Sequence, residues 1–157
     1  MPSSSFPVKV VWRPEPPFKV TFFVWAAVLH KIPTLDSLQL QRRGFQFPNR
    51  CELCRRNSES TDHILVHCDM AYKVWCFFIE SFQFSWTCPC TTGDLLQSWH
   101  GLKFSKEGRK LWSLIPHAVF WMLWKTHNEL IFRSTLSNQS AGRSGNESES
   151  GSVGAAD

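Results

Sequence analysis

Four residues of metal-binding type lie close together in the middle of the chain: Cys51, Cys54, His63 and Cys68. Their spacing is C-x2-C-x8-H-x4-C. A C-x-x-C turn directs two thiolates to one side, where both can bind one Zn²⁺ at about 2.3 Å. Three thiolates and one imidazole complete a tetrahedral shell with no open position, which is typical of structural rather than catalytic zinc. The sequence therefore predicts one structural Zn²⁺ in this segment.

The identity of the histidine ligand has an alternative. His67 adjoins Cys68 and would give C-x2-C-x12-H, but that set is incomplete without Cys68 itself. His63 and Cys68 are five residues apart, so they converge if a helix begins at or just after His63. We favour His63, and expect His67 on the surface or beside the ligands.

The remaining residues of this type predict no further site. Cys76, Cys88 and Cys90 are irregularly spaced, so we interpret them as incidental thiols. No strand-then-helix pattern surrounds Cys51 and Cys54, which disfavours a redox pair. Because the carboxylates show no pairing beyond what helix caps and surfaces explain, we expect no enzyme activity. Asp62 is interpreted as a capping residue or a support for the ligands.

Basic residues are concentrated around the cluster. The chain carries a net charge of +4, and five arginines lie within fifteen residues that contain one acidic residue, Glu52. Such an excess favours a phosphate-binding patch, although a solvated basic face and a helix end served by two of the arginines are alternatives. Phe45 and Phe47 could stack there on unpaired bases. The arginines are Arg42, Arg43, Arg50, Arg55 and Arg56.

The apolar pattern predicts a mostly α architecture, a small helical domain around a Cys3His zinc knuckle. No period-2 run is long enough for a sheet. We expect Phe22, Trp25, Ala26 and Leu29 to face the core in the first helix, and Met70, Val74, Phe77 and Phe78 in the third. Pro116 should kink or split the last helix. The expected helices cover residues 18–30, 34–43, 70–82, a short turn at 92–99, and 106–132.

Both ends of the chain differ in composition from its body. Prolines interrupt the first 19 residues, so no signal peptide is expected, and the most apolar later run is far shorter than the about 20 residues of a membrane span. The protein should therefore reside in the nucleus or cytoplasm and not be secreted. Residues 134–157 are rich in Ser and Gly and contain no aromatic residue, which predicts a disordered tail.

Several flanking elements follow one another in a fixed order along the chain. They are Trp12, the segment PFKVTFFVW at 17–25, TLDSL at 34–38, RRG at 42–44, Trp75, and FWMLWKTHN at 120–128 with Phe132. With the cysteine cluster and its ESTDHILVHC segment, they closely resemble the zinc-binding domain downstream of the reverse transcriptase in plant LINE-type (non-LTR) retrotransposons. The resemblance covers residues 12–133 and leaves residues 1–11 as an N-terminal extension.

The resemblance implies a Zn²⁺ held by Cys51, Cys54, His63 and Cys68, and a supporting role in the polymerase of the element. Such a module would grip RNA or single-stranded DNA, beside a reverse transcriptase domain. No Asp-Asp pair precedes the region and no RNase H carboxylate set follows it, so we expect no polymerase activity of its own. The alternative is a structural or protein-interaction fragment in which zinc only stabilises the fold.

Overall fold

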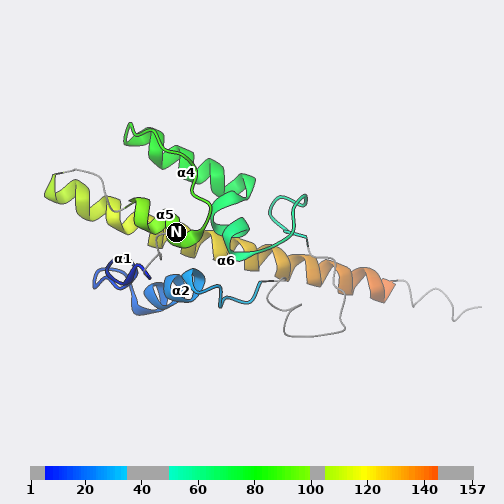
Figure 1. Ribbon diagram of the computed structural model, residues 1–157. Helices are drawn as coiled ribbons and strands as arrows, with labels where there is room; N and C mark the ends of the chain where they lie inside the picture. Colours follow the sequence, from blue (N-terminus) through cyan, green and yellow to red (C-terminus); the bar gives the residue numbers. More distant parts are fainter. Residues whose placement is uncertain (1–5, 35–49, 100–104, 145–157) are drawn as a thin grey trace, which may run out of the picture.

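The computed structural model describes residues 6–34, 50–99 and 105–144, and all regular structure within them is helical (Figure 1). The predicted mostly α architecture is therefore confirmed. The expected helix at 34–43, together with Arg42, Arg43, Phe45 and Phe47, lies outside the described residues apart from Thr34. The elements are α1 (Val8–Val11), α2 (Phe18–Val28), η1 (His63–His67), α4 (Asp69–Ser81), α5 (Thr92–Trp99) and α6 (Lys106–Ser144).

Helix α6 is the spine against which the other elements pack. Its 39 residues correspond to about 58 Å at 1.5 Å per residue. Figure 1 shows it crossing the view, with α2 along one side and α4 on the other. Helices α2 and α5 and the turn η1 all contact α6. The segments before and after the cysteine cluster are therefore held by one common helix.

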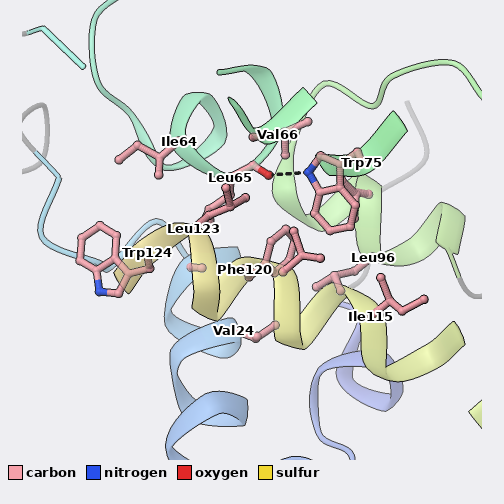
Figure 2. Packing of buried hydrophobic residues seen from close by; sticks show 14 of the residues in the cluster. Val24, Ile64, Leu65, Val66, Trp75, Leu96, Ile115, Phe120, Leu123 and Trp124 are labelled. Atoms are coloured by element: carbon pink, nitrogen blue, oxygen red, sulfur yellow. Dashed lines mark hydrogen bonds between the residues drawn. The ribbon is translucent and has the colours of Figure 1, made fainter. Parts of the chain in front are cut away.

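The core is centred on Trp75 of α4 and Phe120 of α6, both fully buried. Their rings meet edge to face with centroids 5.5 Å apart, a favoured aromatic geometry. The indole N–H of Trp75 donates to the Leu65 carbonyl at 2.8 Å, which ties α4 to η1 (Figure 2). Val24 of α2 and Leu123 of α6 complete this region of the core. The metal-binding segment is thus anchored on a conventional apolar core.

Pro116 neither ends α6 nor splits it into two helices. A proline has no N–H, so the carbonyl four residues earlier, at Trp112, loses its helical partner. The indole N–H of Trp99 donates to that carbonyl at 2.7 Å, and the Trp112 indole donates back to the Trp99 carbonyl at 2.9 Å. The two rings stack with centroids 4.1 Å apart. A tertiary contact therefore replaces the missing helical hydrogen bond.

Two predicted core faces are only partly right. In α2 the buried side chains include Phe23, Val24 and Ala27. Of the predicted residues, Trp25 and Ala26 pack against the core while partly buried, whereas Phe22 and Leu29 are exposed. In α4 the buried face is Ala71, Trp75 and Ile79, while Met70 and Phe77 are exposed and Val74 and Phe78 only partly buried. Both helices carry apolar residues on more than one side. Periodicity alone therefore does not determine which side packs inward.

The predicted start of the disordered tail at residue 134 is also wrong. Helix α6 continues to Ser144, through a stretch of weak helix formers. Helix formation is costly at nucleation and inexpensive in propagation, so a helix already packed on a core extends readily. The hydroxyls of Thr135, Ser137 and Ser140 donate to carbonyls three or four residues earlier. Residues 145–157 lie outside the described residues.

We predict that replacing Trp99 by Phe costs more stability in the wild-type chain than in a Pro116→Ala background. In the single variant W99F the Trp112 carbonyl loses its indole donor, which costs about 1–3 kcal/mol. In the double variant the alanine introduced at position 116 supplies a helical N–H to that carbonyl. The lost ring stacking is common to both backgrounds, so urea unfolding of the four chains isolates the hydrogen bond. Equal costs of W99F in both backgrounds would contradict this account.

Candidate metal centre

Four ligand atoms converge at one place in the structure: those of Cys51, Cys54, His63 and Cys68, all within 4.8 Å of one another. The Sγ atoms of Cys51 and Cys68 are 4.0 Å apart. Cys54 Sγ and His63 Nε2 are 3.3 Å apart. Cys51, Cys68 and His63 are buried, and Cys54 is partly exposed. The four residues predicted from spacing are therefore brought together.

A tight loop after Cys51 presents the first two thiols. The Cys51 N–H donates to the Asn57 carbonyl, and the Arg55 N–H donates to the Cys51 carbonyl, both at 2.8 Å. Arg55 adopts a left-handed backbone conformation with φ of 55°. This conformation is uncommon outside glycine, and here it turns the chain back towards Cys51. The loop thereby places Cys54 beside His63.

A π-helical turn presents the other two ligands. In η1 the Cys68 N–H donates to the His63 carbonyl at 2.6 Å, a hydrogen bond between residues five apart. The two ligands are also five residues apart in the sequence, so the turn brings the Cys68 and His63 side chains close together. The Ser60 hydroxyl accepts from the His63 N–H at 3.1 Å and fixes the start of the turn. An α-helical turn would align His63 with His67 instead, because its hydrogen bonds span four residues.

The spacing of the donor atoms fits Zn²⁺. With Zn–S near 2.3 Å and Zn–N near 2.05 Å, a tetrahedral site places two sulfurs about 3.8 Å apart and sulfur and nitrogen about 3.5 Å apart. The observed separations of 4.0 and 3.3 Å lie close to these values. Three sulfurs and one nitrogen are a donor set typical of structural zinc. The residues present therefore fit one zinc ion.

Hydrogen bonds between the four side chains shift the pKa values of the clustered residues. The hydrogen bond with Cys68 and burial together raise the pKa of Cys51 to about 11. The same hydrogen bond lowers the pKa of Cys68. A hydrogen bond with Cys51 raises the pKa of His63 against the opposing effect of burial. Because metal ligands must be deprotonated, binding of Zn²⁺ would release these protons. The positive charge of the ion would then stabilise the thiolates.

A buried pair, missed by the sequence analysis, links the cluster loop to α6. His127 Nε2 lies 2.8 Å from Glu59 Oε2, and both side chains are 1% exposed. The imidazole stacks on Trp124 with centroids 5.1 Å apart. Because 68 residues separate the partners, no local pattern in the sequence indicates the contact. It fixes the segment between Cys54 and His63 on the spine helix.

Two neighbours of the cluster have roles other than metal binding. His67 is exposed and its Nε2 lies 2.8 Å from the Cys90 carbonyl, so the alternative ligand points away from the site. Asp62 Oδ1 accepts hydrogen bonds from both the N–H and the hydroxyl of Thr92 at 2.8 Å. Asp62 thus caps the start of α5. It is a capping residue as predicted, but the helix that it caps begins 30 residues later in the chain.

The three described arginines of the predicted basic patch are all exposed: Arg50, Arg55 and Arg56. Arg56 forms an ion pair with Asp69 at 2.9 Å, and Arg55 lies 4.0 Å from Glu52. Exposed pairs of this kind contribute little stability. Another anion could therefore replace either carboxylate at little cost.

Within the described part of the chain, no second group of metal-binding side chains converges. Cys76, Cys88 and Cys90 are free thiols, partly or fully exposed. No described helix has the length and apolar character needed to cross a membrane.

Part of the chain matches a known family. Residues 2–75 match the family model described as zinc-binding in reverse transcriptase. The matched segment contains all four clustered ligands, η1 and the first half of α4. Over this segment the resemblance to a reverse transcriptase zinc-binding domain is therefore confirmed. Comparisons with curated proteins and with solved structures gave no significant match.

We predict one zinc per chain, lost on His63→Ala and retained on His67→Ala. His63 contributes a donor atom to the cluster, whereas His67 faces the Cys90 carbonyl. Elemental analysis of protein purified without added metal, with far-UV circular dichroism, measures both variants. Zinc retained in H63A and lost in H67A would reverse the ligand assignment.

The Glu59–His127 pair should make stability fall at alkaline pH. Burial opposes a charge on His127, but the hydrogen bond and charge of Glu59 outweigh it and raise the pKa of His127. A raised folded-state pKa gives stability that is present below the unfolded value of about 6.5 and lost as pH rises through the folded value. His127→Gln alone should cost about 3 kcal/mol or more, because it leaves Glu59 buried without its charged partner.

The double variant E59Q/H127Q is the control for that prediction. It replaces the charged pair by two neutral amides, so it should lose the alkaline dependence and cost less than H127Q alone. Chemical unfolding between pH 6 and 9 measures both effects. A wild-type chain and double variant with the same pH dependence would contradict the predicted role of the pair.

Proposed function

We propose that the chain is a zinc-stabilised accessory module that binds single-stranded nucleic acid and has no polymerase activity of its own. The observation that carries the proposal is the buried Cys3His cluster inside the segment that matches zinc-binding in reverse transcriptase. A closed ligand shell supports a fold rather than a reaction. Zn²⁺ bound by Cys51, Cys54, His63 and Cys68 would hold the loop and η1 together.

Nucleic-acid binding is supported by charge. The chain carries a net charge of +4, and Arg50, Arg55 and Arg56 are exposed on and beside the loop that presents the thiols. A phosphate can replace a surface carboxylate at these arginines at little cost, because Arg binds either anion through bidentate hydrogen bonds and an exposed ion pair contributes little stability. Arg42 and Arg43 precede this loop in the sequence and belong to the same arginine-rich segment.

The proposed partner is RNA or single-stranded DNA, beside a reverse transcriptase domain. The proposed origin is a plant LINE-type retrotransposon, on the basis of the ordered motifs that resemble that family. The nucleus or the cytoplasm is the proposed location.

A second candidate function, a protein-interaction module, is favoured by one observation. Large aromatic side chains on α2 and before it are exposed, among them Trp12, Phe18 and Phe22. Exposed apolar surface often marks a binding site for another macromolecule. Self-association in solution would support this second candidate.

The proposed function predicts salt-dependent binding of a 20-nucleotide single-stranded RNA. Each phosphate contact should contribute about 0.7 to the slope of log affinity against log salt. The variant Arg50→Gln/Arg56→Gln should therefore weaken binding and lower the slope by about 1.4, while it retains zinc. Fluorescence anisotropy between 50 and 300 mM salt measures both quantities.

The control variant Lys73→Gln/Lys125→Gln removes the same charge from exposed positions on α4 and α6, and should change the affinity less. Absence of binding by zinc-loaded wild-type protein, or an affinity that does not vary with salt, would overturn the proposed function.

A further inference from the structure

An exposed row of aromatic rings runs along α2 and the segment before it. Trp12, Phe18 and Phe22 are 40%, 74% and 49% exposed. Ring centroids are 6.3 Å apart from Trp12 to Phe18, 6.3 Å from Phe18 to Phe22, and 5.4 Å from Phe22 to Trp25. Trp25 closes the set at 6.2 Å from Trp12. The four rings thus form one continuous surface, the aromatic row.

A basic cleft is lined in part by Arg13, the residue that follows Trp12 in the chain. It has a volume of about 270 Å³ and lies between the segment after Trp12 and the start of α6. Arg13 Nε is buried without a hydrogen-bond partner among the described residues, and lies 3.5 Å from Glu15 Oε2. The cleft is lined by four basic residues and one acidic residue: Arg13, Lys106, Arg109, Lys110 and Glu15.

The charge of the cleft suits a phosphate group. Small-molecule pockets are usually lined mainly by apolar side chains, whereas this cleft is lined mainly by cations. Arg13, which lines the cleft, follows Trp12 of the aromatic row directly in the chain. Lys19 adds a further cation, with Nζ 5.7 Å from the centroid of the Trp121 ring.

This combination favours nucleic acid over protein as the occupant. Proteins that bind single strands without sequence preference combine a positive groove for the backbone with aromatic rings on which bases stack. Protein–protein interfaces, in contrast, are depleted in lysine, and here Lys106 and Lys110 line the cleft, while Lys19 follows Phe18 in α2.

Resting on the proposed function, we propose that the aromatic row and the basic cleft form a second binding surface for the single strand. Phosphates bind at Arg13, Lys106 and Lys110, and unpaired bases stack on Phe18 and Phe22. We call the loop that carries Arg50, Arg55 and Arg56 the arginine loop. Its Arg55 lies beside Leu130 and Arg133 of α6. Lys110 precedes Leu130 by 20 residues, which corresponds to about 30 Å along the helix. In this proposal one strand contacts both the first turn of α6 and the surface near Leu130 and Arg133.

The test uses the zinc-loaded full chain, the 20-nucleotide RNA and two variants of exposed residues. Lys106→Gln/Lys110→Gln should weaken binding about tenfold or more at 100 mM salt and lower the salt slope by about 1.4. Phe18→Leu/Phe22→Leu should also weaken binding about tenfold or more, with the slope unchanged, because it removes stacking and no charge. The variant K73Q/K125Q is the control matched in charge to the lysine pair.

The outcomes separate this inference from the proposed function. Wild-type binding that neither variant weakens beyond the control would overturn the inference and leave the proposed function intact. A wild-type chain that binds no RNA would overturn both. A dimer in sedimentation analysis that F18L/F22L dissociates, with RNA affinity unchanged, would assign the aromatic row to a second copy of the chain and overturn the inference. The lysine variant alters only exposed side chains, so it tests the proposal even if the phenylalanine variant is destabilised.

Discussion

The packing of the π-helical turn η1 on α6 is the contact on which the rest of the structure depends. Ile64, Leu65 and Val66 are completely buried, and the Leu65 carbonyl is held by the Trp75 indole. Because His63 begins this turn and Cys68 follows it, the burial of the three apolar residues fixes two ligands at once. The apolar core thereby positions half of the metal site through contacts that do not involve the metal.

The other half of the site depends on a different kind of contact. The loop that carries Cys51 and Cys54 has few buried side chains, and its return towards His63 passes through Glu59. A buried carboxylate is costly unless it is paired, so His127 both permits the burial of Glu59 and determines where the loop lies. Zinc would join two halves that are already held, one by apolar packing and the other by a buried ion pair.

The spine helix also separates the two surfaces proposed for nucleic acid. The arginine loop lies beside its later residues, and the basic cleft beside its first turn. Helix α6 remains continuous between them because Trp99 replaces the hydrogen bond that Pro116 removes. The spacing of the two cationic surfaces is thus set by one continuous helix.

The amino-acid sequence by itself determined the helical class, most helix positions and the four clustered residues. The starts of α2, α4, α5 and α6 follow from local patterns, and ligand type and spacing are themselves local properties of the chain. The choice of His63 over His67, however, follows from the π-helical turn, which tertiary packing stabilises. Likewise, only the folded chain decided which apolar side of α2 and α4 is buried, because both helices offer more than one. The Glu59–His127 pair and the Trp99–Trp112 contact join residues distant in sequence, and no local pattern records such partners.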